Sequence, residues 1–206
     1  MRTEGRRESG NIEDRRGMSP GKMAVGGGIG TIVIVLLVML LGGDPSQVVN
    51  SLQEGPATES GPVSTSPEEE AMKDFVSKVL AGTEDVWSTV FRESNMTYKM
   101  PTLVLFRDQV QSACGYASGA SGPFYCPGDE KVYIDLAFFD ELKSRFGAYG
   151  DFAIAYVIAH EIGHHVQNQL GILSDVNNQR SRMSEVNANR LLVRLELQAD
   201  FLAGMW

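Results

Sequence analysis

The sequence lacks an excess of positive charge: 18 lysines and arginines stand against 26 aspartates and glutamates, and the formal net charge is -8. This balance argues against nucleic-acid binding, because a protein that binds the phosphate backbone presents a basic face. Cysteine and histidine are also scarce, with two and three residues, and no internal repeat is present. A site made of thiolates or imidazoles therefore has few residues to draw on.

All three histidines fall within six residues, in the segment Ala159-His160-Glu161-Ile162-Gly163-His164-His165. The spacing H-E-x-x-H puts His160 and His164 on one face of a helix, so both imidazoles can bind one metal ion. Glu161 lies beside them, where it can act on a water molecule. A chance match is the alternative, but the clustering of every histidine favours a metal site. His165 projects about 100° further round the helix and is a weak ligand candidate.

The residues around this motif predict a buried helix. Gly150 or Asp151 can begin it, and Gly171 suits the left-handed position just past its end. The residues before the motif are apolar on nearly all sides of the helix. Polar side chains in such a helix need partners, because burying them unpaired costs free energy.

A catalytic zinc takes three protein ligands, so a third is expected beyond the two histidines. The following helix, which Ser181 or Ser184 can cap, carries Glu196 and Asp200 four residues apart on a face bordering its apolar stripe. Glu196 is the favoured ligand, with Asp200 orienting the far nitrogen of one histidine. Asp200 is the alternative ligand, and Glu185 is a weaker candidate. If Glu196 has no function, it is an ordinary solvated acid at the edge of an amphipathic helix.

The first 66 residues predict membrane attachment. Residues 1–22 are polar and arginine-rich, and we expect a disordered basic tail. Residues 23–43 carry no charge and are long enough to span a bilayer as one transmembrane helix, with a removed signal peptide as the alternative. Residues 44–66 are rich in glycine, proline and serine and predict a flexible linker. Lysine and arginine cluster before the span, so the tail is expected in the cytoplasm and the later residues outside.

Residues 67–206 predict one α+β domain, mostly helical with a small sheet. Ser66 and Pro67 are typical of a helix start, and a new helix can begin at Thr83. Two strands and a helix follow, at Thr102–Phe106, Lys131–Ile134 and Asp135–Gly147. The chain stops at Trp206 within an apparent helix, so we expect the natural sequence to continue.

Cys114 and Cys126 are the only cysteines and are separated by eleven residues. Outside the cytoplasm such a pair is expected to form a disulfide, worth about 3 kcal/mol for a loop of this size. The alternatives are a nucleophilic cysteine paired with a histidine and a pair of thiolate metal ligands. Both alternatives need reduced thiols, which the expected location disfavours.

Five segments carry a family resemblance: Arg6-Arg7-Glu8-Ser9, Ser112–Gly115, Gly122–Asp129, Ala159–Asn168 and Glu196–Asp200. Together they resemble the bacterial putative neutral zinc metallopeptidase family, a zincin-like group of membrane-anchored proteins. The resemblance implies a Zn2+ site at His160, His164 and Glu196, with Glu161 catalytic. Phe201 differs from the cysteine that commonly follows the Ala-Asp pair in that family.

The favoured hypothesis is a zinc metallopeptidase that acts on peptide or protein substrates. It is expected as a single-pass protein of the bacterial inner membrane, with its zincin-like domain on the periplasmic side. Glu161 would be the general base toward a zinc-activated water. The mechanism also needs a hydrogen-bond donor to the oxyanion, and the candidates are Tyr133, Tyr156 and His165. An extended substrate could pair with the edge of the strand Lys131–Ile134.

Two other functions are compatible with the sequence. One is a non-catalytic envelope protein that binds partners or acts as a scaffold, with a structural or vestigial zinc site. The other is a cysteine hydrolase that uses Cys114 or Cys126 with a histidine. The first predicts a closed four-ligand metal site or no metal at all, and the second predicts a free thiol.

Overall fold

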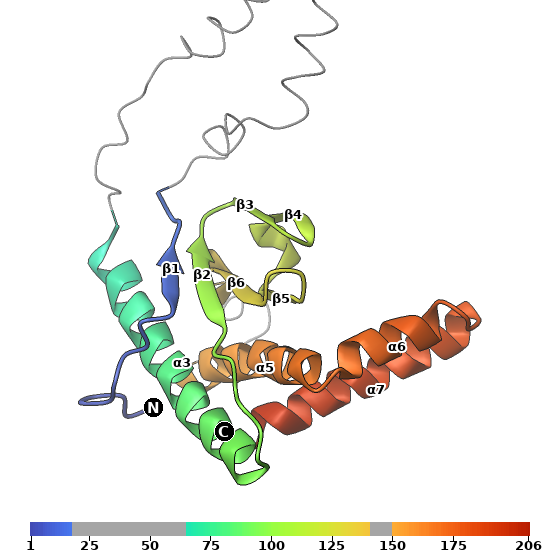
Figure 1. Ribbon diagram of the computed structural model, residues 1–206. Helices are drawn as coiled ribbons and strands as arrows, with labels where there is room; N and C mark the ends of the chain where they lie inside the picture. Colours follow the sequence, from blue (N-terminus) through green and yellow to red (C-terminus); the bar gives the residue numbers. More distant parts are fainter. Residues whose placement is uncertain (18–64, 141–149) are drawn as a thin grey trace, which may run out of the picture. The chain divides into compact units, whose positions relative to one another are not determined.

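The computed structural model describes residues 1–17, 65–140 and 150–206 (Figure 1). Met1–Arg16 and Thr65–Trp206 pack into one unit of mixed α+β type, as predicted at this level. Its strands are β1 (Ile12–Asp14), β2 (Thr102–Phe106), β3 (Gln109–Ser112), β4 (Gly115–Ser118), β5 (Phe124–Cys126) and β6 (Lys131–Asp135). Its helices are α3 (Pro67–Glu93), α5 (Asp151–Gln169), α6 (Ile172–Arg180) and α7 (Glu185–Ala203), with a short 3-10 turn, η2 (Gly119–Ser121).

Helix α3 begins as the sequence predicts and then continues past the predicted break. The Ser66 side chain accepts from the backbone N–H of Glu69, and the Glu69 side chain accepts from the backbone N–H of Ser66. This reciprocal capping satisfies two amide groups that lack helical partners. Thr83 does not start a new helix, because its hydroxyl donates to the Leu80 carbonyl at 2.7 Å and is satisfied within the turn.

The main sheet has the order β1-β2-β6-β5. β1, β2 and β6 run parallel, and β5 runs antiparallel to β6 at the edge. One face packs against α3 and α5 through apolar residues that alternate along the strands. This core contains Val76, Leu80, Trp87 and Phe91 of α3, Leu103, Leu105, Val132 and Ile134 of the sheet, and Ile158, Ile162 and Val166 of α5.

The other face of the sheet is covered by a short antiparallel hairpin. β3 and β4 form it, with Val110 packed among Val104, Phe106 and Tyr133. Neither this hairpin nor β5 was predicted from the sequence. Both consist of strands of three or four residues, too short for a clear alternation of polar and apolar positions.

Residues 1–17 are not a disordered tail, contrary to the sequence prediction; residues 18–22, the rest of the predicted tail, lie outside the described residues. β1 pairs in parallel with β2, with Ile12 opposite Leu103. Ser9 and Arg16 are buried, at 7% and 4% exposure. The prediction failed because the segment is held by hydrogen bonds and ion pairs to residues far along the chain, which a search for hydrophobic periodicity does not detect.

The predicted transmembrane helix at 23–43 and the predicted linker at 44–66 lie almost wholly outside the described residues. Among the helices that the structure describes, none is both long and apolar enough to cross a bilayer. The end of the predicted helix Asp135–Gly147 also falls outside the described residues.

Helices α5, α6 and α7 form the C-terminal part of the described chain (Figure 1). α5 has Gly150 at its N-cap, and Gly171 follows it with φ of 77°, the left-handed conformation predicted there. α6 was not predicted; it pairs with α7, which starts after Ser184. α5 and α7 pack along each other, which brings the H-E-x-x-H segment beside the last helix.

Candidate metal centre

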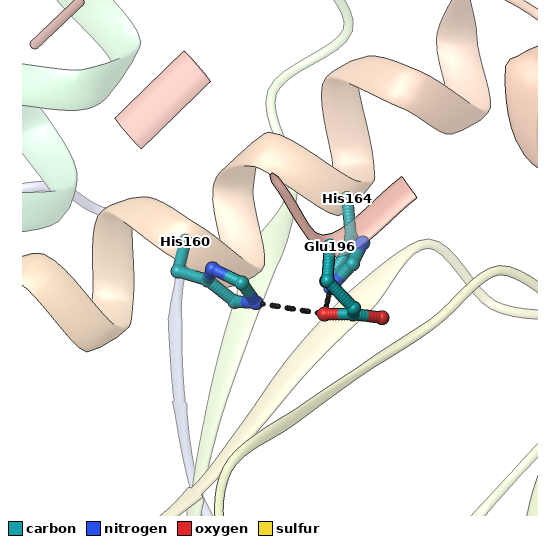
Figure 2. Close-up of side chains that lie close together, drawn as sticks. All are labelled: His160, His164 and Glu196. Atoms are coloured by element: carbon teal, nitrogen blue, oxygen red, sulfur yellow. Dashed lines mark ion pairs between the residues drawn. The ribbon is translucent and has the colours of Figure 1, made fainter. Parts of the chain in front are cut away.

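Two histidines of α5 and one glutamate of α7 converge on one point (Figure 2). The Nε2 atoms of His160 and His164 lie 3.3 and 3.4 Å from the same oxygen of Glu196. Two ligands of a tetrahedral zinc with bonds near 2.0–2.1 Å are about 3.4 Å apart, so the spacing fits such an ion. Ligand atoms from all three side chains lie within 4.8 Å of one another.

In each histidine Nδ1, the ring nitrogen that does not face Glu196, makes a hydrogen bond. Asp200 lies 2.9 Å from Nδ1 of His160, and the amide oxygen of Gln167 lies 2.9 Å from Nδ1 of His164. Both partners accept, so in the neutral imidazoles the proton sits on Nδ1 and the Nε2 lone pair points at Glu196. Two lone pairs facing a carboxylate repel unless a cation lies between them. The donor set therefore suits a bound zinc ion.

Gln167 is a part of this centre that sequence reasoning missed. It is fully buried, and its amide nitrogen donates to the Leu195 carbonyl at 2.8 Å and to the Gln198 side chain at 3.0 Å. Those two bonds fix the amide so that its oxygen faces His164. The available signal was its position three residues after His164 on a buried helix, where a polar side chain needs partners.

Close contact between the two helices sets the ligand distances. A Cβ atom at Gly163 would lie 2.8 Å from the Ala199 carbonyl oxygen and 3.1 Å from the Ala199 Cα. Only glycine allows the α7 backbone to come this near to α5. Because Ala199 lies between Glu196 and Asp200 on α7, this contact places both acids against the histidines.

Glu161 lies beside the cluster in a desolvated position. The residue is 8% exposed, and burial raises the pKa of its carboxyl to about 7. Glu196 also raises this pKa, whereas His164 and the backbone N–H of Tyr125 lower it. A carboxyl that can exchange a proton near neutral pH suits general acid-base chemistry.

A cavity of about 330 Å³ opens next to His160 and Glu161. Its wall is largely apolar and includes Gly122, Pro123, Phe138, Tyr156 and Val157. The Tyr156 hydroxyl donates to Asp200, which raises the pKa of Tyr156 to about 12 and keeps it a hydrogen-bond donor. This volume lies at the lower end of the range of about 300–1,000 Å³ that is typical of ligand pockets.

Three other candidates from the sequence lie away from this cluster. His165 is fully buried, with Nε2 2.7 Å from the Lys99 carbonyl and Nδ1 3.0 Å from the Tyr125 hydroxyl. Tyr133 donates to Asp129 and packs on the opposite face of the sheet. Glu185, at the start of α7, is not among the grouped ligands.

Cys114 and Cys126 form a disulfide with a Cα separation of 5.7 Å. Cys126 ends β5, and the preceding residue, Tyr125, supplies the backbone N–H beside Glu161. The bridge therefore ties the β3–β4 hairpin to the strand nearest the candidate base. With both thiols bonded, neither cysteine can serve as a nucleophile.

Comparison with known sequences gives one family and several relatives. The family model described as putative neutral zinc metallopeptidase matches residues 1–206. The chain is 42% identical over 213 residues to the uncharacterized protein YpfJ of Escherichia coli strain K12, an alignment covering 100% of this chain and 74% of that protein. It is 48% identical over 110 residues to an uncharacterized protein of Mycobacterium tuberculosis strain H37Rv, covering 53% and 36% respectively. No solved structure matches the chain.

Proposed function

The chain belongs to the putative neutral zinc metallopeptidase family, and on this premise we propose that it hydrolyses peptide bonds at a zinc centre held by His160, His164 and Glu196. The observation that supports this most is the convergence of two Nε2 atoms and one carboxylate oxygen at spacings that suit tetrahedral zinc. Zinc bound there would lower the pKa of a coordinated water toward ~7 and polarise the carbonyl of the scissile bond.

Glu161 is the proposed general base. It is buried beside the ligands, and it takes the proton of the attacking water and passes it to the leaving amine. Asp200 and Gln167 orient the two imidazoles by accepting from their Nδ1 atoms. Of the three residues considered as oxyanion donors, Tyr156 is the one that lines the cavity. In the proposal it takes that role by turning its hydroxyl proton from Asp200 toward the oxyanion.

The substrate is proposed to lie along β5 and not along β6. Lys131–Ile134 was the strand considered for this role from the sequence, but β6 has strand neighbours on both sides and offers no free edge. β5 is at the edge of the sheet within the described residues, and an edge strand can add an extended peptide. It also adjoins Glu161 through Tyr125.

A binding or scaffold protein with structural zinc is the rival function. Structural zinc is normally closed by four protein ligands, whereas the group found among the described residues has three, and the Glu196 side chain is 51% exposed. Solvent access at the third ligand supports a centre that keeps a position for water. We also propose attachment to the bacterial cell membrane through residues 23–43, on their sequence alone and without assigning the N-terminal segment and the domain to opposite sides of the membrane.

The Glu161→Gln variant tests the proposed mechanism. We expect about one zinc per chain in the parent and in this variant, with hydrolysis of labelled casein lowered by roughly 10²-fold or more in the variant. His160→Ala should lose the metal, and Glu185→Gln, an exposed acid on α7, should behave as the parent. Chelator-sensitive cleavage that survives in Glu161→Gln would contradict the role of Glu161. Zinc binding without any cleavage by the parent would support the rival function.

A further inference from the structure

A buried carboxylate on α3 is satisfied by the N-terminal segment. Glu84 is 0% exposed, and its two oxygens accept from Arg7 at 3.0 Å, from Asn11 at 2.7 Å and from the Ser9 hydroxyl. All three donors precede residue 17. A carboxylate buried without partners costs free energy, so these donors are integral to the packing of α3.

The same segment is joined to the sheet by its backbone. The Leu103 amide donates to the Asn11 carbonyl at 2.8 Å, and the Arg15 amide donates to the Leu105 carbonyl at 2.7 Å. These bonds bracket the parallel ladder between β1 and β2. In a sheet each bond satisfies one group on each strand, so removing β1 would leave one side of β2 unpaired.

Ion pairs add to these contacts. Glu13 lies 2.7 Å from the Lys131 ammonium on β6, and Arg16, almost fully buried, lies 2.6 Å from Glu70 on α3. The segment is thus held by α3, β2 and β6 together. The Arg6-Arg7-Glu8-Ser9 motif, which the proposed metal chemistry does not use, acquires a role through Arg7 and Ser9.

We propose that Met1–Arg16 and Thr65–Trp206 form one folded body and therefore lie on the same side of the membrane. Hydrogen bonds between β1 and β2, and between Glu84 and its three donors, require both partners in one compartment. This holds equally if β1 is exchanged between two copies of the chain. The arrangement expected from charge bias, with residues 1–22 in the cytoplasm and the domain outside, would divide this sheet between two compartments. The inference does not depend on the proposed peptidase activity.

Thiol labelling in bacterial cells tests this inference. Glu4 and Glu93 are both exposed, one in each half of the body, and each is replaced by cysteine in a separate full-length variant. The native cysteines are bonded to each other and do not react without reductant. Both variants are treated with a membrane-impermeant maleimide before and after lysis, with the outer membrane permeabilised. We expect the same pattern for the two sites. Labelling of one site in intact cells and of the other only after lysis would overturn the proposal.

A cleavage experiment tests the contact itself. A specific protease site is placed among residues 44–64 of the full chain, which is purified in detergent and then cut. We expect the N-terminal fragment to stay bound to the domain through size-exclusion chromatography. Arg7→Ala should release the fragment at least about tenfold faster, because the buried Glu84 carboxylate then loses its cationic partner. Arg6→Ala, next to it with an exposed side chain, is the matched control and should retain the fragment. Release as fast in the parent as in Arg7→Ala would overturn the proposal, with circular dichroism checking that each variant is folded.

Discussion

Glu196 and Asp200 lie one turn apart on α7, and the structure gives them different partners. Glu196 faces the Nε2 atoms of both histidines, whereas Asp200 bonds Nδ1 of His160 and the Tyr156 hydroxyl. The spacing in the sequence put both acids on one face of a helix but could not choose between them. The choice depends on the register in which α7 packs against α5, and the spacing of residues within one helix does not determine that register.

Asp200→Asn should weaken zinc binding without removing the ligands. An asparagine is uncharged, and its oxygen accepts more weakly from the Nδ1–H of His160, so the imidazole is less firmly oriented and less basic. We expect the zinc dissociation constant to rise about 10- to 100-fold, as measured by competition with a chromogenic chelator. Asp175→Asn, an exposed acid on α6, serves as the control. An unchanged dissociation constant would show that Asp200 does not orient His160.

Part of the site could be predicted from the sequence because it is local. His160, Glu161 and His164 belong to one helix, and the helical repeat alone fixes their relation. Gln167 belongs to the same helix, but its orientation depends on the Leu195 carbonyl of another element. The backbone contact of Tyr125 with Glu161 likewise depends on β5, a three-residue strand with no distinctive pattern.

At the scale of elements, the contact between α5 and α7 depends on one glycine. In Gly163→Ala the added methyl would lie 2.8 Å from a backbone oxygen of α7, so the helices must separate. We expect a loss of about 1–3 kcal/mol in the free energy of unfolding, measured with urea, and weaker zinc binding as Glu196 moves away. Gly10→Ala, where nothing lies within 4 Å, should change neither quantity. Zinc affinity equal to that of the parent would mean that the ligands do not depend on this contact.

Strand β1 should loosen in acid. Arg15 and Lys131 lower the pKa of Glu13 to about 2 from an ordinary 4.5, and Arg16 and Lys73 lower the pKa of Asp14. A depressed pKa stabilises the folded form above the ordinary value, and this stabilisation is lost as pH falls from about 4.5 toward about 2. The Glu13 side chain is 37% exposed, so solvent screening limits its share.

Amide hydrogen exchange of the N-terminal segment can measure this effect. After correction for intrinsic rates, we expect faster exchange at Ile12–Asp14 at pH 3 than at pH 7, and a smaller difference in Glu13→Gln. Protection independent of pH would show that the ion pairs contribute nothing to the attachment of β1.

Long elements were predicted better than short ones. α3, α5 and α7 carry apolar residues at helical spacing over many residues, and α3 also has a side-chain cap, whereas β1 is three residues long and surrounded by charged ones. Its stability comes from Glu84, Lys131 and Leu103, which lie far along the chain. No local pattern in residues 1–17 reveals those partners, so a composition typical of disorder gave the wrong answer.

For the whole molecule, zinc should act as a stabilising ligand. The ligands come from two helices that approach only in the folded chain, so binding favours the folded state over the unfolded one. Free zinc at a hundredfold excess over its dissociation constant should raise the free energy of unfolding by about 2.7 kcal/mol. Urea titrations with and without zinc measure this. His160→Ala should show little or no increase, and an equal increase in that variant would place the stabilising metal elsewhere.

The sheet also sets an order of events during synthesis. Ile12 pairs with Leu103, so β1 leaves the ribosome about 90 residues before the strand it must join. At roughly 5–20 residues per second, the segment waits on the order of 5 to 20 seconds without its partner. Parallel strands so distant in sequence are slow to find each other, because a long loop must close first. β1 therefore stays unpaired at least until β2 has been made, and any factor that binds residues 1–17 of the nascent chain in that interval competes directly with folding.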